Sequence, residues 1–184
     1  MKCINLGCGT DLREGEDWIN LDNHNSNGAN AIFDLDRIFK GEKLPFEDNT
    51  FDLVVCNHVL HTFVYPLPII QELIRICKPG GIIDIKTHLP NANNSSINMV
   101  RGHTQGMFRT IADNNYFQGY KKDSKKGLKC GLKINSIKYY TNSINLSVRL
   151  ATWFCNLLPY KLVEKTILMY LFPFLSVNVR YEKE

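Results

Sequence analysis

Residues 51–86 carry two apolar runs joined by an amphipathic stripe and a tight turn, and few folds accommodate this order. The runs are FDLVVC at 51–56 and IIDIK at 82–86. The stripe between them has helical spacing and consists of Ile70, Leu73, Ile74 and Cys77. The letters KPGG at 78–81 follow it, and proline with glycine ends a helix. Strand, helix and strand in this order form a right-handed crossover, which predicts two parallel strands.

Three more apolar runs precede this unit and extend the predicted sheet. They are CINL (3–6), WINLD (18–22) and NAIFD (30–34). Near-continuous apolar runs are typical of strands that are covered on both faces. We therefore predict an α/β fold with a Rossmann-like, doubly wound, mostly parallel sheet. The alternating run VNVRYEK (177–183) predicts an antiparallel C-terminal edge strand.

The connection between the first two predicted strands is short. Only eight residues, 10–17, lie between the first glycines and Trp18. A parallel crossover with its helix normally uses a dozen or more residues. The sequence therefore predicts that the first crossover helix is a single turn or absent.

The length of the chain bounds its organisation. At 184 residues it is long enough for one domain and short for two. We expect a single domain over 1–184 with its core at 1–88. Residues 89–130 are polar, asparagine-rich and punctuated by glycine, which predicts a lid or substrate loop. Residues 131–184 are expected to supply C-terminal helices and the edge strand, with helical periodicity at 145–158 and 160–171.

Composition and charge place the chain among ordinary globular proteins. Hydrophobic residues make up 44%, charged residues 22%, and the net charge of +4 does not by itself indicate nucleic acid. Seven lysines gather in one stretch, which is more often a solvated face than a binding site: Lys121, Lys122, Lys125, Lys126, Lys129, Lys133 and Lys138. The six cysteines form no CxxC pair and no zinc spacing, so we expect no metal site.

The N-terminus and the most apolar segment bear on localisation. Met1-Lys2 leads directly into a strand pattern, without a charged and then apolar leader, so we expect a cytoplasmic protein with reduced thiols. The segment 157–179 is interrupted by charges and prolines too often for a membrane-spanning helix. A peripheral membrane or protein contact through 157–179 stays open as an alternative.

The first predicted strand ends in two glycines one residue apart. Gly7, Cys8 and Gly9 fall at the switch point of a doubly wound sheet, where such folds bind ligands. Glycine permits positive φ and lets backbone N–H groups approach a ligand, although a tight turn without a ligand has the same pattern. Asp22 ends the second strand, where a carboxylate can accept hydrogen bonds from ribose hydroxyls, and Asp34 ends the third.

Two missing motifs narrow the predicted ligand. The third glycine of a dinucleotide fingerprint is replaced by Leu12, which disfavours NAD. No GK[ST] follows the first glycines, so a Walker loop is absent as well. These observations predict a nucleoside ligand without a pyrophosphate.

The motifs taken together resemble a known family. In chain order they are NLGCG, NLD, FDL, LPFEDNTFDLVVCNHVLHTF and LIRICKPGGIIDIK, and they cover residues 3–88. They are similar to the motifs of class I S-adenosylmethionine-dependent methyltransferases, in the small type 11 group. A weaker similarity to members associated with sugar and cell-envelope pathways lies in GHTQGMFRT and VNVRYEK. The resemblance implies the class I methyltransferase fold and S-adenosyl-L-methionine as cofactor.

The resemblance also implies roles for single residues. Gly7, Cys8 and Gly9 would pass beneath the methionyl part of the cofactor, and Asn5 replaces an acidic residue that often accompanies them. Asp22, with Asn23 adjacent, would hold the ribose hydroxyls, and Asp34 and Leu35 would border the adenine. Asn57 and His58 would line the cofactor near its sulfonium.

Methyl transfer needs alignment, exclusion of water and, for a hydroxyl acceptor, removal of a proton. Four histidines near strand ends or in the predicted lid are candidate bases, and we favour His103 as the catalytic residue over His58, His61 and His88. The [DN]PP[YF] block of base-amine methylation and the Pro-Cys nucleophile of cytosine methylation are missing, which disfavours nucleic-acid bases.

We therefore expect a methyltransferase that acts on a small molecule, with a sugar or envelope-precursor hydroxyl as one candidate acceptor. Three alternatives remain open. The first is a non-catalytic S-adenosylmethionine-binding protein, and the second is an RNA methyltransferase that uses the lysine face at 121–138. The third is a nicotinamide-dependent oxidoreductase.

Overall fold

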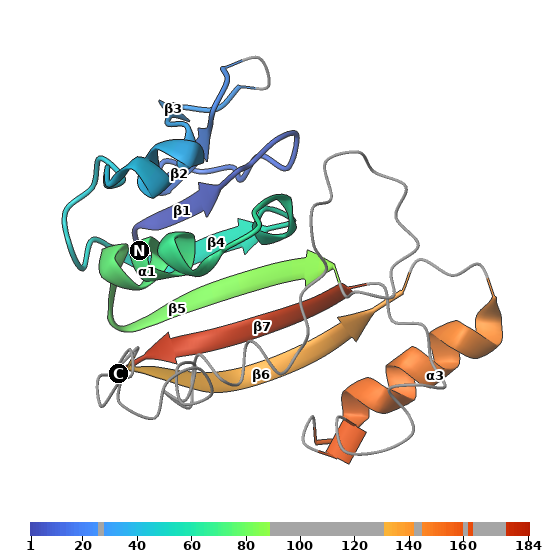
Figure 1. The fold of residues 1–184 in the computed structure, drawn as a ribbon. Coiled ribbons are helices and arrows are strands. Elements are labelled where there is room, and N and C mark those ends of the chain that lie inside the picture. The colour runs from blue at the N-terminus through green and yellow to red at the C-terminus, as the bar shows by residue number, and fades with distance from the viewer. Residues whose placement is uncertain (26–27, 89–130, 142–144, 160–161, 164–175) are drawn as a thin grey trace.

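A seven-stranded sheet organises the protein, as seen in a computed structural model (Figure 1). The structure describes residues 1–25, 28–88, 131–141, 145–159, 162–163 and 176–184. The sheet has the order β3-β2-β1-β4-β5-β7-β6. Its strands are β1 (Cys3–Leu6), β2 (Trp18–Asp22), β3 (Ala31–Ile32), β4 (Phe51–Asn57), β5 (Cys77–His88), β6 (Leu132–Tyr140) and β7 (Ser176–Lys183).

The strand directions confirm the predicted doubly wound, mostly parallel sheet. Strands β3, β2, β1, β4 and β5 pair in parallel, and β7 pairs antiparallel with β5. The predicted edge position of β7 is wrong, because β6 pairs with its other side. Strand β6 lies at the end of the lysine-rich stretch. Its exposed positions include Lys133 and Lys138, so its sequence is less apolar than that of the buried strands. The C-terminal strand is therefore antiparallel and internal.

The short first connection contains no helix, as predicted, and all of its residues, 7–17, are described. Side-chain amides from β1 and β2 hold the loop instead. Asn5 Nδ2 donates to the carbonyl oxygen of Asp11 at 2.7 Å. Asn20 accepts from the N–H of Arg13 and donates to its carbonyl oxygen, both at 2.9 Å. These bonds satisfy loop backbone groups that a helix would otherwise pair internally.

Helix α1 (Leu67–Ile76) lies over one face of the sheet and buries its apolar stripe there (Figure 1). The 3-10 helix η1 (Leu35–Lys40) lies beside it. Helix α1 ends at Ile76, and β5 begins at Cys77, so the letters KPGG lie within this strand rather than in a separate turn before it. The register of β5 on β4 shifts at this point, between Phe51 and Leu53. A Cβ on Gly81 would lie 2.9 Å from the carbonyl oxygen of Lys78 and 3.1 Å from that of Asp52, so this close approach requires glycine.

Arg75 on α1 fixes the loop that leads into β4. Its guanidinium donates to the carbonyl oxygens of Leu44 and Phe46 at 3.0 and 2.7 Å, and to Asp48 at 2.8 Å. It also forms a pair of hydrogen bonds with Glu72, at 2.8 and 2.7 Å. Burial raises the pKa of Glu72, but the hydrogen bonds from Arg75 and from the N–H of Leu44 outweigh it, and the net pKa is lowered.

Helix α3 (Leu146–Leu157) confirms the predicted helix that begins near Asn145, whose side chain accepts from the N–H of Ser147 at its N-terminus. Asn156 pairs with the edge strand β6: it accepts from the N–H of Tyr139 at 2.8 Å and donates to its carbonyl oxygen at 2.9 Å. This contact blunts an otherwise open strand edge. Several apolar side chains of α3 are exposed, namely Leu146, Leu150, Trp153, Phe154 and Leu157.

Several predictions lie outside the described residues. They are the lid at 89–130 with His103, the five lysines from 121 to 129, and most of the helical pattern at 160–171. The apolar segment at 157–179 is likewise described only in part. Among the residues that are described, no helix is both long and apolar enough to cross a membrane.

Candidate functional site

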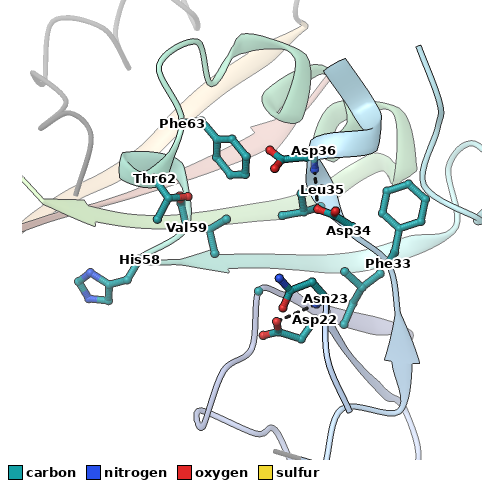
Figure 2. A pocket seen from close by; sticks show the side chains of 12 residues that line it. Asp22, Asn23, Phe33, Asp34, Leu35, Asp36, His58, Val59, Thr62 and Phe63 are labelled. Atoms are coloured by element: carbon teal, nitrogen blue, oxygen red, sulfur yellow. Dashed lines mark hydrogen bonds between the residues drawn. The ribbon is translucent and has the colours of Figure 1, made fainter. Parts of the chain in front are cut away.

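A cavity of about 450 Å³ opens at the carboxyl ends of β1, β2 and β4. Figure 2 shows His58 at one end and Asp34 with Phe33 at the other, with Asp22 and Asn23 between them. The remaining lining comes mainly from η1 and from η2 (Leu60–Thr62), through Leu35, Asp36, Val59, Thr62 and Phe63. The cavity therefore lies at the switch point of the sheet, where the sequence predicts a ligand.

The two glycines after β1 adopt left-handed backbone conformations, with φ of +61° at Gly7 and +50° at Gly9. Val59 packs directly against Gly7, and a Cβ there would lie 2.4 Å from Val59 Cγ2. Nothing lies within 4 Å of a Cβ added at Gly9. The first glycine is thus required by both conformation and space, and the second by conformation alone.

Asp22 connects the glycine turn to the end of β2. Its Oδ2 accepts from the N–H of Gly9 at 2.7 Å, and its Oδ1 accepts from the N–H of Asn23 at 2.7 Å. A carboxylate offers about four acceptor positions, so two backbone bonds leave capacity for hydroxyl donors. Asp22 therefore orders the loop and can also bind a diol.

The far wall of the cavity is built around the start of η1. Asp34 precedes this helix, and its Oδ1 accepts from the N–H of Asp36 at 3.0 Å. Phe33 is buried, and the Arg37 guanidinium stacks over its ring at 4.9 Å. Phe63 from the opposite side stacks on Phe39, with the ring centroids 5.4 Å apart. The rings of Phe33 and Phe63, with Leu35, give the cavity an apolar surface suited to a planar base.

The charge of the cavity is acidic. Three carboxylates line it, from Asp22, Asp34 and Asp36, and no lysine or arginine belongs to its described lining. Such an acidic lining disfavours a phosphate ligand and favours a cationic or hydroxyl-rich one. This agrees with the predicted nucleoside without a pyrophosphate.

Four of the residues expected to contact the cofactor do not line the cavity. Asn5 is buried beneath the loop, where it bonds Asp11. The Cys8 side chain is also buried, and burial together with the nearby Asp22 charge raises the pKa of its thiol. Asn57 lines a different cavity, because alternate residues of β4 face opposite sides of the sheet. Gly9 does not line the main cavity either and acts through its N–H on Asp22.

The cavity also holds residues that the sequence analysis did not assign. Val59, Thr62 and Phe63 belong to the NHVLHTF stretch, from which only Asn57 and His58 were expected as cofactor contacts. The NHVLHTF stretch indicates that part of the site lies there. Which of its side chains face the cavity depends on the 3-10 turn at Leu60–Thr62, which the sequence does not predict.

Three histidines gather at the His58 end of the site. His58 has φ of +55°, and its N–H donates to the carbonyl oxygen of Lys86 at 2.7 Å. His61 lies in η2 and is buried, and His88 ends β5. Desolvation of the ring and the nearby His88 and Lys86 lower the pKa of His58 to about 4. His58 is therefore a neutral imidazole at neutral pH.

Comparisons of sequence agree with this architecture. Residues 16–85 match the family described as a methyltransferase domain. An uncharacterized methyltransferase of Schizosaccharomyces pombe is 44% identical over 57 residues, which is 31% of this chain and 19% of that protein. A demethylmenaquinone methyltransferase of Bacillus pumilus is 44% identical over 41 residues, which is 22% of this chain and 18% of that protein. The chain thus spans about a fifth of the length of these curated relatives.

Solved structures show the same fold at low sequence identity. A S-adenosylmethionine-dependent methyltransferase from Mesorhizobium loti has a TM-score of 0.56 at 14% identity, covering 99% of this chain and 90% of that one. One from Archaeoglobus fulgidus has a TM-score of 0.56 at 16% identity, covering 99% and 86%. The [4+2]-cyclase SpnF also has a TM-score of 0.56, at 13% identity, covering 99% and 74%. The fold alone therefore does not fix the chemistry.

Fold and cavity together define a doubly wound α/β protein with a nucleoside-sized site at its switch point. The fold is that of solved class I S-adenosylmethionine-dependent methyltransferases, and residues 16–85 match the methyltransferase-domain family. The family implies S-adenosyl-L-methionine as its cofactor. The residues present fit that group, because the cavity volume is in the range of small-molecule sites and Asp22 can accept from ribose hydroxyls.

Proposed function

We propose that this protein transfers a methyl group from S-adenosylmethionine to a small-molecule acceptor. The observation that carries the proposal is the acidic cavity at the carboxyl ends of β1, β2 and β4, in which Asp22 is bonded to the glycine turn. The bound cofactor would supply a methyl group already activated by a sulfonium. The task of the chain is then to bind, orient and exclude water.

Each wall of the cavity suits a different part of that ligand. Asp22, with Asn23 beside it, would hold the ribose hydroxyls, and the apolar surface around Leu35 would face the base, with Asp34 at its edge. Gly7 and Val59 form the floor between them. The three carboxylates would also favour a ligand with net positive charge over an anionic one.

We propose a hydroxyl of a sugar or envelope-precursor molecule as the acceptor class, supported by the sequence similarity of GHTQGMFRT and VNVRYEK to one subgroup. His103 is our proposed proton acceptor for such a hydroxyl, on the basis of its place in the expected lid. A His103→Gln variant should bind the cofactor normally and lose turnover. An equal turnover in the variant would remove His103 from the mechanism.

The experiment that tests the function combines binding with transfer. Binding of S-adenosylhomocysteine is measured by calorimetry. The protein is also incubated with methyl-labelled S-adenosylmethionine and either a panel of hydroxylated small molecules or RNA, and label in the acceptor fraction is counted. Binding of S-adenosylhomocysteine with label transfer supports the proposal. Tight binding without transfer to any acceptor favours a non-catalytic S-adenosylmethionine-binding protein, and transfer to RNA alone favours the lysine-face alternative.

A further inference from the structure

We infer that His58, His61 and His88 form a binding site for one divalent transition-metal ion of the Zn²⁺ class, at the edge of the cofactor cavity. The observation is the convergence of three imidazoles from three separate elements. One ring nitrogen of each lies within 4.8 Å of those of the other two. The ring centroids are 4.6 Å apart for His58 and His88, 4.7 Å for His61 and His88, and 6.1 Å for His58 and His61.

The fold fixes this convergence rather than leaving it to flexible side chains. Strands β4 and β5 are parallel neighbours, and Asn57 pairs with Lys86, so His58 and His88 follow at the same edge of the sheet. The left-handed backbone at His58 turns the chain into η2, which brings His61 back to the same edge. The hydrogen bond from the N–H of His58 to Lys86 holds that turn against β5.

The geometry is close to that of a three-histidine metal site. In tetrahedral coordination with Zn–N distances of about 2.0–2.1 Å, ligand nitrogens lie about 3.3 Å apart. The separations of up to 4.8 Å exceed this by about 1.5 Å, which side-chain rotations can close around an ion. Imidazole nitrogen suits zinc, copper, nickel and iron, and excludes magnesium and calcium as preferred ions.

Three protein ligands leave one coordination position open, as in catalytic rather than structural zinc sites. His58 also lines the cofactor cavity, so that position borders the cavity. If the proposed function holds, an acceptor hydroxyl bound to the ion would have a lowered pKa, which would assist the proton transfer to the base proposed above. This second step rests on the proposed function, whereas metal binding itself does not.

The test is a metal titration of the chelator-stripped and dialysed protein. Zn²⁺ binding is measured by calorimetry, and Co²⁺ binding by the visible absorption of a four-coordinate nitrogen site. His58→Asn and His88→Gln remove one imidazole each, and asparagine tolerates the left-handed backbone at position 58. His24→Gln is the matched control, because His24 is exposed and lies outside the cluster.

We expect one Zn²⁺ per chain, an affinity loss of at least about 100-fold in His58→Asn and His88→Gln, and none in His24→Gln. Absence of saturable binding, or equal losses in all three variants, would overturn the site. Titrating the same preparations with S-adenosylhomocysteine separates the two proposals. An Asp22→Ala variant should lose the nucleoside and keep Zn²⁺, so failure of either site shows independently of the other.

Discussion

Replacing Gly7 by alanine tests how the site is built, because two separate costs can be assigned to it. The first is conformational: φ of +61° is the left-handed region, which costs a residue with a Cβ about 1–2 kcal/mol. The second is steric: the new Cβ would lie 2.4 Å from Val59 Cγ2, so Val59 and the turn into η2 must shift. Overpacking of this kind costs about 1–3 kcal/mol. We expect Gly7→Ala to lower the free energy of unfolding by about 2–5 kcal/mol, the sum of the two costs.

Gly9→Ala provides the matched control for this prediction. Its φ of +50° carries the conformational cost, but nothing lies within 4 Å of the added Cβ. The expected loss is therefore only about 1–2 kcal/mol. The double variant Gly7→Ala/Val59→Ala removes the steric conflict, and it should be more stable than the sum of the single changes by about 1–3 kcal/mol.

The assay is urea unfolding followed by tryptophan fluorescence, with far-ultraviolet circular dichroism as a second probe. The unsubstituted protein, Gly7→Ala, Gly9→Ala, Val59→Ala and the double variant are compared at one pH and salt concentration. Equal losses for Gly7→Ala and Gly9→Ala, or strict additivity in the double variant, would refute the claim that Val59 closes the floor of the cavity on Gly7.

Two other changes test the framework around the site. Glu72→Gln should lower the free energy of unfolding by about 2 kcal/mol at neutral pH, since Arg75 and the N–H of Leu44 lose a charged acceptor. The folded-state pKa of Glu72 is lowered, so the stabilisation from its charged form is complete above the unfolded-state pKa of about 4.3 and is lost as the pH falls below it. The free energy of unfolding should therefore fall less steeply from pH 6 to pH 3 in Glu72→Gln than in the unsubstituted protein. Parallel curves would contradict this. Asn156→Ala removes both hydrogen bonds to the backbone of Tyr139 on β6 and should lower the free energy of unfolding by about 1–3 kcal/mol. Ser147→Ala in the same helix is the control and should lower it by less than about 1 kcal/mol. Equal losses of stability in urea unfolding would show that Asn156 does not protect this edge.

The core of the fold could be predicted because each element has a local cause. The runs at 3–6, 18–22 and 51–56 are apolar enough to be buried in a parallel sheet, and the letters KPGG mark the end of α1 within two residues, although they lie in β5. The edge position of the last strand could not be predicted, since it depends on pairing with β6 across a long stretch of chain. Strand order on the C-terminal side is a tertiary property and has no local signature.

Some residues of the candidate site could be predicted from the sequence, and others could not. Gly7 and Asp34 follow strands β1 and β3, so their place at the carboxyl edge of the sheet is implied by the fold, and they line the cavity. Asp22 and Asn57 are the last residues of β2 and β4, and Asn5 lies within β1, so the alternation of faces decides whether each side chain reaches the ligand. Asp22 lines the cavity, whereas Asn5 and Asn57 turn away from it.

The spacing of the cysteines predicts no metal site, and no local pattern of the sequence joins the three histidines. The three histidines lie at positions 58, 61 and 88, so their convergence depends on the pairing of β4 with β5.

The measurement that tests the central claim most directly is isothermal titration of the protein with S-adenosylhomocysteine, compared with an Asp22→Ala variant that is shown to be folded by circular dichroism. The account predicts saturable binding at one site and a loss of tenfold or more in the variant, which corresponds to about 1.4 kcal/mol. Absence of binding at millimolar ligand, or unchanged affinity in the variant, would contradict the assignment of the cavity beside Asp22 as the cofactor site.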